Sequence, residues 1–529
     1  MCVLAVFSLS FALNVSDFIL SRGNDTAPAL FHLDTVVTYA ELRREVARLT
    51  SGLSARSRPE GQRIGVCSEN SPFFVSAYLG IIGAGLVAVP LSADLSAESF
   101  AKVVRDAGIR ELFVSRRFHR RLKPWAEVSG VVLLVEGDLD ISAIPETGAS
   151  GFSSRDCSFQ HSACNSENAP SSLASLMFTS GSTGAPRGVM VTHRNIESNT
   201  RDIVAYMALT TADRAMVVLP FHYCFGLSVL HSLLAAGGSL VLNNQCMYPE
   251  SVLADMVGKA CTGLAGVPST YQILLRKSRF KEMQFPALRW LQQAGGKLPN
   301  SFIREIQEAF PQVSYYLMYG QTEATARLSY LPPGRLRDKL GSIGQGLPST
   351  RLAVLKPDGT TVTPGSDEVG EIVAFGPNVT LGYWHDPEET ARYFRSGGLY
   401  TGDLARVDSD GFIFIVDRER EMIKSGGNRV SAKEVEDIIS ELPEVVEVAV
   451  VGVSHELLGE AIQAFVVVTE GAVVNPSEIM THCQRRLPAY KRPESVKFLP
   501  ALPHNSVGKV LKGKLKPAGP VGAAEEAIK

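Results

Sequence analysis

Short apolar runs alternate with amphipathic stretches from Ser175 to Met318, and this alternation limits the fold more than any other feature of the sequence. The runs predict strands at Leu176–Phe178, Ala215–Leu219, Ser239–Leu242, Thr262–Val267, Leu288–Leu291 and Val313–Met318. Helical periodicity fills the stretches between them; one helix enters at Thr192, and another runs from Pro299 to Phe310. The alternation predicts an α/β fold with a parallel, doubly wound sheet, in which ligands bind beyond the carboxyl ends of the strands.

The pattern changes beyond Gly341, where short strands separated by Pro/Gly/Asp turns predict a β-rich subdomain over about 341–416. With it, a large amino-terminal domain would cover residues 1–416. A small mobile α+β domain is predicted over 421–516, with helices at Ala432–Leu442 and Pro476–Leu487 and strands at Val445–Val453 and Ala464–Thr469. The charged residues 417–420 between the two domains are either a hinge or a solvated turn. The Ala/Gly/Pro-rich tail 517–529 is predicted to be disordered.

Charge and cysteine usage exclude several classes of protein. The chain has 529 residues, with 52 Lys and Arg against 54 Asp and Glu, and this net charge of −2 provides no global field for nucleic acid or an anionic membrane. Its eight cysteines, at positions 2, 67, 157, 164, 224, 246, 261 and 483, form no CxxC pair. We therefore expect reduced, mostly buried thiols in a cytoplasmic protein.

The first fifteen residues, Met1–Val15, are apolar and uncharged. They are too short to span a bilayer as a helix and lack the basic leader and cleavage site of a signal peptide. A loosely packed first helix or an extension from a misplaced start is the favoured interpretation, and secretion is the minor one. No later segment has about 18 uninterrupted apolar residues, so no membrane span is expected.

A hydroxyl- and glycine-rich loop follows the first strand of the alternating region, from Phe178 to Gly188. Its four hydroxyls, its three glycines (Gly188 among them) and its cation suit a polyphosphate, because backbone N–H groups can turn inward beside several donors and a positive charge. The residues concerned are Thr179, Ser180, Gly181, Ser182, Thr183, Gly184 and Arg187. The loop fits neither a Walker A motif nor a nucleophile elbow.

This loop resembles the phosphate-binding signature of the adenylate-forming (AMP-binding) superfamily, which includes acyl-CoA synthetases and 4-coumarate-CoA ligases. Further elements of that family appear in its order, and the resemblance extends from about Thr38 to Leu515. They are Tyr319-Gly-Gln-Thr-Glu323, Gly370-Glu371 with Gly382-Tyr383-Trp384, Tyr400-Thr-Gly-Asp403, Asp417-Arg418 with Lys424-Ser-Gly-Gly427, and Gly508-Lys509. The resemblance implies the adenylate-forming fold and an ATP-dependent activation of a carboxylic acid.

The resemblance also assigns roles to individual residues around the nucleotide. Glu323 would hold Mg²⁺, Thr322 would bond the α-phosphate, and Asp403 would accept both ribose hydroxyls. The other implied nucleotide contacts are Arg418 at the ribose and phosphate, and Tyr319, Gly320, Ala294, Gly295 and Gly296 near the adenine. Each has a plainer alternative: Glu323 could favour a helix amino terminus, Asp403 could lie in an ordinary turn, and Tyr319 could be a core aromatic.

Lys509 would stabilise the charge that grows on the transferred phosphate, although most lysines are simply surface residues. In the family the carboxy-terminal domain then rotates about the position of Arg420. Rotation would bring a second loop, with Lys424, Gly426 and Gly427, to the site for the thiol step. The family usually has lysine where this chain has Arg187, which keeps the charge.

The acid is expected to bind among His222, Tyr223, Gly266, Tyr271 and Ala294. His222 falls at the family's aromatic gate, although a lone histidine is more often structural. Tyr223 stands where amino-acid-activating members carry Asp, so a plain carboxylic acid such as a fatty acid is expected. Basic clusters at Arg116–Lys123 and at Arg485, Arg486, Lys491 and Arg492 are solvated surface by default, and the second could meet CoA phosphates.

The resemblance predicts a two-step ligase with ATP, Mg²⁺ and CoA: acid and ATP give acyl-AMP, and a thiol then gives the thioester. The phosphopantetheine of a free carrier protein is the second choice of acceptor. A nucleotide-binding pseudoenzyme is the alternative from a different class. The residues Thr322, Glu323, Asp403 and Lys509 argue against it because all of the implied chemical groups are present.

Overall fold

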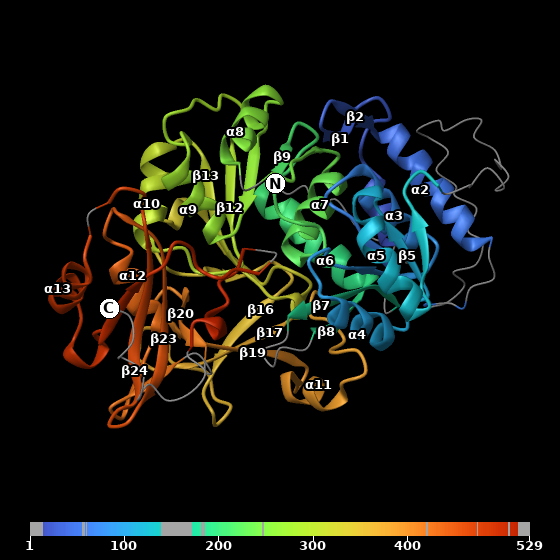
Figure 1. The fold of residues 1–529 in the computed structure, drawn as a ribbon. Coiled ribbons are helices and arrows are strands. Elements are labelled where there is room, and N and C mark those ends of the chain that lie inside the picture. Colours follow the sequence, from blue (N-terminus) through green and yellow to red (C-terminus); the bar gives the residue numbers. More distant parts are fainter. Residues whose placement is uncertain are drawn as a thin grey trace, which may run out of the picture. The chain divides into compact units, whose positions relative to one another are not determined.

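The computed structural model describes residues 14–55, 59, 61–138, 172–180, 186–245, 248–418, 422–472, 474–505 and 508–516 (Figure 1). Nearly all of the apolar segment Met1–Val15 and the whole predicted tail 517–529 lie outside these residues. The chain divides into two compact units. The first comprises Met1–Ala212, Phe221–Leu242 and Pro377–Thr390, and the second comprises Asp213–Pro220, Asn243–Gly376 and Ala391–Lys529.

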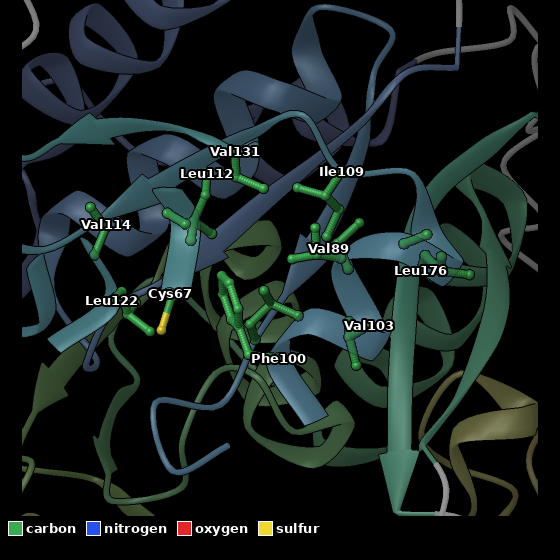
Figure 2. Packing of buried hydrophobic residues seen from close by; sticks show 14 of the residues in the cluster. Cys67, Val89, Phe100, Val103, Ile109, Leu112, Val114, Leu122, Val131 and Leu176 are labelled. Carbon is green, nitrogen blue, oxygen red and sulfur yellow. The ribbon is translucent and has the colours of Figure 1, made fainter. Parts of the chain in front are cut away.

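The first unit contains a six-stranded sheet with the order β6-β5-β3-β4-β7-β8. Its strands are β3 (Arg63–Cys67), β4 (Val87–Pro90), β5 (Glu111–Val114), β6 (Val132–Val135), β7 (Leu173–Ser180) and β8 (Pro186–Thr192). Helices α4 (Ala97–Ala107) and α5 (Arg116–Ser129) contribute Phe100, Val103 and Leu122 to a core that also holds Cys67 and Leu176 from the sheet (Figure 2). This packing buries the apolar side of both helices.

One difference from the sequence-based expectation concerns β8. The strands of this sheet pair in parallel except for β7 and β8, which are antiparallel with Met177 opposite Val189. No strand was predicted between the glycine-rich loop and the helix that enters at Thr192, and the structure has β8 there, so the loop joins two strands. Val189 and Val191 are both buried, so the alternating residues after the loop have the period of a strand.

The first unit also contains a second group of strands, in which β1 (Pro28–His32) pairs in parallel with β10 (Ser239–Leu242) and antiparallel with β2 (Thr35–Thr38). The helices here are α1 (Val15–Leu20), α2 (Tyr39–Ser54), α3 (Pro72–Gly83), α6 (His193–Met207) and α7 (Cys224–Ala236). Thr192 caps α6 in a reciprocal arrangement with Asn195, which confirms the predicted entry point.

The second unit is built on parallel strands in the order β13-β12-β11-β9. They are β9 (Arg214–Val217), β11 (Gly263–Gly266), β12 (Trp290–Gln293) and β13 (Ser314–Tyr319), and β14 (Ser329–Leu331) and β15 (Gln345–Gly346) follow antiparallel to them. The helices are α8 (Pro249–Gly258), α9 (Pro268–Lys277) and α10 (Asn300–Ala309). The predicted strands of this region are confirmed, with the run at Leu288–Leu291 shifted to β12.

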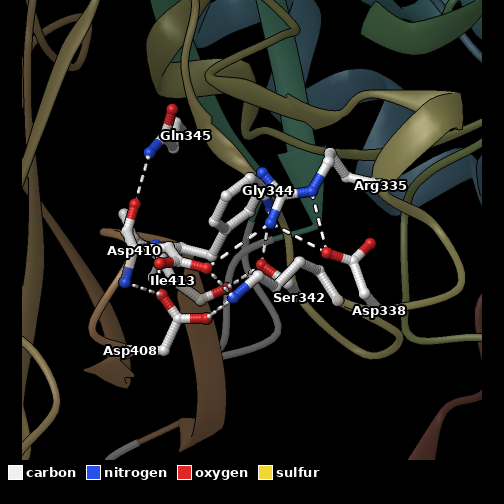
Figure 3. A network of polar contacts seen from close by, with 10 residues as sticks. Arg335, Asp338, Ser342, Gly344, Gln345, Asp408, Asp410 and Ile413 are labelled. Carbon is white, nitrogen blue, oxygen red and sulfur yellow. Dashed lines mark hydrogen bonds and ion pairs between the residues drawn. The ribbon is translucent and has the colours of Figure 1, made fainter.

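A five-stranded antiparallel sheet follows, which agrees with the predicted β-rich character of this stretch. It contains β16 (Arg351–Leu355), β17 (Gly370–Phe375), β18 (Phe394–Arg395), β19 (Gly398–Val407) and β20 (Ile413–Arg418), and α11 (Pro387–Tyr393) lies between β17 and β18. A polar network fastens the turn between β19 and β20 to the chain before β15 (Figure 3). Lys339 lies 2.7 Å from Asp408 and 2.5 Å from Asp410, and Arg335 lies 3.4 Å from Asp410.

The carboxy-terminal part of the second unit has its own α+β core. Strands β21 (Ile423–Ser425), β22 (Asn428–Val430), β23 (Val445–His455), β24 (Gly459–Val468) and β25 (Ser495–Phe498) form a sheet, with helices α12 (Ala432–Ile439) and α13 (Pro476–Arg486). Alternate residues of β23 enter two separate cores, because Val450 packs with both helices and Val451 packs with Leu502 and Leu515. The predicted helices and strands of this part are confirmed.

The structure also tests the expectations about the cysteines and about membrane spans. Among the described residues, Cys67, Cys224, Cys261 and Cys483 have buried thiols that form no disulfide, as predicted. Burial raises the pKa of Cys67 to about 12, so this thiol stays protonated. Every helix within the described ranges is too short or too polar to cross a membrane.

Candidate active site

The carboxyl ends of β11, β12 and β13 lie at one edge of the second unit, since these strands are parallel neighbours. The segments that leave this edge carry several of the residues predicted for the nucleotide and acid sites. Gly266 ends β11, Ala294, Gly295 and Gly296 follow β12, and Tyr319 ends β13. The structure thus gathers at one edge the residues that the rule for open α/β sheets places at a ligand site.

A hydrogen-bonded cluster joins β13 to β19 at this edge. The Tyr319 hydroxyl donates a 2.6 Å hydrogen bond to Oδ2 of Asp403, a residue that is 2% exposed. Gln321 donates from Nε2 to the same oxygen at 2.9 Å. The two elements predicted to meet the adenosine are therefore held together by direct contacts.

The backbone beside Asp403 is shaped by two further side chains. Glu371 accepts a 2.8 Å hydrogen bond from the N–H of Gly402, beside an irregularity in the pairing of β17 with β19. The Thr401 hydroxyl accepts from the N–H of Asp403 and donates to the carbonyl of Ile372. These contacts fix the bend that turns Asp403 inward.

A tight loop follows β13 and contains the predicted phosphate and metal residues. Gly320 has no room for a side chain, because a Cβ there would overlap the carbonyl oxygen of Ala326. Thr322 and Glu323 form a short 3₁₀ turn (Thr322–Ala324), and both side chains are half-buried. The close packing of the loop positions the Glu323 carboxylate just beyond the end of β13.

The donor set of this loop fits magnesium and not a fully protein-bound metal. Within the described ranges, no group of three or more His, Cys, Asp or Glu side chains could hold an ion. Mg²⁺ in phosphate-transfer sites commonly takes one or two carboxylates and completes its shell with phosphate oxygens and water. A single carboxylate from Glu323 meets that requirement.

The loop of Lys509 docks at the same edge. The Ser269 hydroxyl, at the start of α9 after β11, donates a 2.9 Å hydrogen bond to the carbonyl of Gly508. Asn505 closes the loop, since its side chain accepts from the N–H of Lys509 at 2.8 Å and its own N–H donates to the Lys509 carbonyl at 2.9 Å. The Lys509 side chain is exposed.

The predicted residues of the thiol step lie in a different hairpin of the carboxy-terminal part. Gly426 and Gly427 form the turn between β21 and β22 with positive φ values of 53° and 79°, and Lys424 is exposed. Arg418 pairs with Asp403 in the register of β20 and β19. The predicted pivot Arg420 lies outside the described residues.

In the first unit, the ends of the predicted phosphate loop form the β7–β8 ladder. Thr179 pairs with Arg187, and the backbone of Ser180 pairs with Pro186. Gly181, Ser182, Thr183 and Gly184 lie outside the described residues. Arg187 is 2.7 Å from Glu389 and 3.6 Å from Asp386, so its charge is balanced within the protein; its contact with phosphate stays a prediction.

The predicted acid-pocket residues fall into both units. In the first, burial lowers the pKa of His222 to about 4, so the imidazole is neutral at pH 7 and suits a gate better than a general acid. Tyr223 occupies the N-cap position of α7, and its ring centroid lies 6.4 Å from that of Phe225.

In the second unit, Tyr271 is completely buried, and its hydroxyl donates to the carbonyl oxygen of Gln292 at 2.7 Å. The hydroxyl also lies 3.3 Å from the carbonyl oxygen of Leu264. The Tyr271 side chain thus links α9 to the sheet. That Tyr271 also lines the acid pocket stays a prediction. Gly266 packs directly against Thr270 and Tyr271.

Comparison with known proteins identifies the family. The AMP-binding enzyme family matches residues 21–384, and its carboxy-terminal domain matches residues 434–509. The chain belongs to the AMP-binding enzyme family.

Relatives and solved structures agree with this assignment. The chain is 33% identical over 499 residues to feruloyl-CoA synthase of Amycolatopsis sp, covering 94% of this chain and 96% of the relative. It is 30% identical over 523 residues to long-chain-fatty-acid–CoA ligase of Salmonella typhimurium, covering 92% and 91%. The anthranilate CoA ligase AuaEII in complex with anthranoyl-AMP superposes with a TM-score of 0.85 at 25% identity, covering 96% and 97%.

The predicted adenylate-forming fold is confirmed, and so is the predicted class of enzyme, an AMP-forming acid–thiol ligase. Sequence reasoning did not identify three residues that make contacts in this candidate site: Gln321, Glu371 and Ser269. Gln321 and Glu371 lie within motifs that the sequence analysis recognised, but the contacts of each residue are visible only in the structure. Ser269 follows a predicted strand, and no sequence pattern indicates that it meets Gly508.

Proposed function

We propose that this enzyme activates a fatty or aryl carboxylic acid as its acyl-adenylate and then transfers the acyl group to CoA. The observation that carries the proposal is the link between Tyr319 and Asp403 at the carboxyl end of β13. This hydrogen bond joins two family motifs at the sheet edge where the loop of Lys509 also docks. The family membership supplies the reaction class, and these residues supply the positions at which this chain would perform it.

In the first step, an oxygen of the acid attacks the α-phosphorus of ATP, and pyrophosphate leaves. Asp403 would hold the ribose hydroxyls, and Thr322 would donate to the α-phosphate. Lys509 would stabilise the negative charge that grows on the oxygens around phosphorus, as a preorganised cation does. A Mg²⁺ held by Glu323 would neutralise the phosphate charge.

In the second step, the thiol of CoA attacks the acyl carbonyl, the bond to AMP breaks, and AMP leaves with the bonding electrons. The Gly426–Gly427 turn leaves room for a narrow pantetheine arm because neither residue has a side chain. Arg420 would act as the pivot that exchanges this turn for the loop of Lys509. The predicted boundaries of domain and hinge, at 416 and 420, belong to this proposal.

The substrate class follows from the groups near α7. His222 is neutral at pH 7, and Tyr223 offers no carboxylate to an α-ammonium group. Burying an ammonium without a counter-charge costs several kcal/mol. The relatives whose names print feruloyl and long-chain fatty acyl groups support an acid without an α-amino group.

A panel assay tests the proposal. Pyrophosphate release would be measured with fatty acids, hydroxycinnamic acids and the matching α-amino acids, first without acceptor and then with CoA or a phosphopantetheinylated carrier protein. We expect release with a fatty or aryl acid and thioester formation with CoA. Selective exchange with an amino acid, a carrier protein as the sole acceptor, or no exchange with any acid would each contradict the proposal.

A further inference from the structure

Gln321 occupies the junction between two sheets of the second unit. Its Nε2 lies 2.9 Å from Oδ2 of Asp403, 3.0 Å from the carbonyl oxygen of Thr401 and 3.2 Å from the Tyr319 hydroxyl oxygen. All three partners can accept a hydrogen bond, so they determine which end of the amide faces them. Gln321 itself follows β13, whereas Thr401 and Asp403 belong to β19.

The two donors to Oδ2 of Asp403 restrain the rotation of its carboxylate about the terminal bond of the side chain. The terminal torsion of an aspartate is broad, so packing alone sets the plane of its carboxylate poorly. Tyr319 donates to Oδ2 at 2.6 Å, and a single donor leaves rotation about that contact. Gln321 donates to the same oxygen from a second residue, which fixes the plane and thereby the direction of Oδ1.

We infer that Gln321 is a positioning residue for the nucleotide: it orients the Asp403 carboxylate so that this group can accept both ribose hydroxyls. The inference rests on the proposed role of Asp403 at the ribose. A carboxylate that receives two hydroxyls must present both oxygens at a defined angle. Gln321 lies at the variable position of the YGxTE element, so its identity sets how firmly this chain holds the ribose.

A purely structural role for Gln321 is the competing explanation, since the same amide also links β13 to β19. The two explanations differ in what they predict for the ligand. A structural link would affect every nucleotide alike. A positioning role would affect only nucleotides that carry the hydroxyls that Asp403 receives.

The experiment compares ATP with 2′,3′-dideoxy-ATP in acid-dependent pyrophosphate exchange. For Gln321→Ala we expect kcat/KM for ATP to fall about tenfold, as for loss of a hydrogen bond to a charged group. For 2′,3′-dideoxy-ATP we expect no change between Gln321→Ala and the natural enzyme. Gln321→Glu would place a second carboxylate beside Asp403, so its loss with ATP should be larger and should shrink as the pH is lowered.

Gln345→Ala is the matched control. Gln345 also donates from Nε2 to the β19–β20 hairpin, at 3.1 Å to the carbonyl of Asp410, but at its far turn (Figure 3). We expect this variant to treat both nucleotides as the natural enzyme does. Thermal unfolding of each variant shows whether it folds, and Gln321→Met, which keeps the side-chain volume, replaces Gln321→Ala if that variant does not.

Equal losses of kcat/KM for ATP and 2′,3′-dideoxy-ATP in Gln321→Ala would overturn the inference, and so would an unchanged value for ATP. A natural enzyme that does not distinguish ATP from 2′,3′-dideoxy-ATP would instead refute the role of Asp403 at the ribose. The inference on Gln321 would fall with it. The two failures are therefore separable by the behaviour of the natural enzyme alone.

Discussion

Ser269 and Gly508 are joined by a 2.9 Å hydrogen bond that fixes the loop of Lys509 at the carboxyl end of β11. Gly508 has a φ of 78°, and a Cβ on it would lie 2.7 Å from the Ser269 oxygen. Only glycine combines this conformation with this contact without strain. In this pose of the enzyme, the docked loop holds Lys509 at the edge where β11, β12 and β13 end.

Lys509→Ala should therefore impair adenylation selectively. We expect acyl-AMP formation to fall by about 10²–10³-fold, as when a preorganised charge is removed from a transition state. Thioester formation from supplied acyl-AMP should survive far better. Single-turnover measurements of the two half-reactions decide this, with the exposed Lys514→Ala as control; equal losses in both half-reactions would remove Lys509 from the chemistry.

Ser269→Ala offers a graded version of the same test. It leaves Lys509 intact and removes one neutral hydrogen bond, worth about 1 kcal/mol. Adenylation should slow by about fivefold, whereas the thioester step should not change. A larger loss in the thioester step would mean that the contact serves a different pose.

Glu323→Gln should change the dependence on magnesium. The amide keeps the shape of the side chain but loses the charge that suits a hard cation, so half-maximal adenylation should require about tenfold more Mg²⁺. Glu308→Gln, on the exposed side of α10, should leave the Mg²⁺ titration unchanged. An unchanged Mg²⁺ titration in Glu323→Gln would mean that the Glu323 carboxylate does not hold the metal and serves only the 3₁₀ turn in which it lies.

Local patterns predicted much of this architecture. The apolar runs that became β11 and β13 are continuous because both faces of a parallel strand are covered, and Thr192 announced α6 through its capping chemistry. The β8 strand was missed because the chain from Phe178 to Gly188 was interpreted as a phosphate-binding loop, and no strand was assigned before Thr192. Its pairing with β7 is a contact that no local pattern records.

Contacts between distant segments could not be predicted from the sequence either, because no local pattern records them. Asp403 and Tyr319 were each recognised in a motif, but their hydrogen bond joins residues 84 positions apart. Arg187 was expected to face phosphate, and the structure shows it balanced by Glu389, 2.7 Å away. Such pairings depend on how sheets and turns pack and not on local periodicity.

His504 should make stability depend on pH. Its Nε2 lies 3.0 Å from Oε1 of Glu447, and this hydrogen bond raises the pKa of the imidazole from 6.5. A raised pKa means that the folded state binds the proton more tightly, so the stabilisation is complete below pH 6.5 and is lost as the pH rises through the folded-state pKa.

The comparison of His504→Gln with the natural enzyme therefore depends on pH. The variant should unfold at a lower temperature near pH 6 and at nearly the same temperature near pH 9. Glu447→Gln should abolish the same pH-dependent difference, because it removes the partner that favours the protonated ring. A destabilisation of His504→Gln that is the same at both pH values would show that the ion pair contributes nothing.

The last prediction concerns the pose of the carboxy-terminal part. Lys297, directly after Gly296, lies 2.5 Å from Asp437 on α12, and the Ser301 hydroxyl donates to the Ser440 carbonyl at 3.0 Å. Together with the contact of Ser269 and Gly508, these links hold the pose in which the loop of Lys509 is docked. If the enzyme rotates about Arg420 for the thiol step, the ion pair must break during every turnover.

Asp437→Asn should weaken this pose without removing a catalytic group. Burial raises the pKa of Asp437, so ionisation already costs free energy there, and a neutral amide should be tolerated by the fold. A partly exposed pair contributes about 1 kcal/mol at most, so adenylation should slow by up to about fivefold. The thioester step from supplied acyl-AMP should be unchanged or faster, because the competing pose has lost part of its stability.

Glu434→Gln is the matched control, since Glu434 lies on the same helix and pairs at 2.7 Å with Lys491 inside the carboxy-terminal part. It should lower the two half-reactions equally or not at all. Lys297→Met should reproduce Asp437→Asn, and the double variant should be no worse than either single one, because the two side chains act through one interaction. Additive losses, or a slower thioester step in Asp437→Asn, would mean that the pair does not govern the exchange between poses.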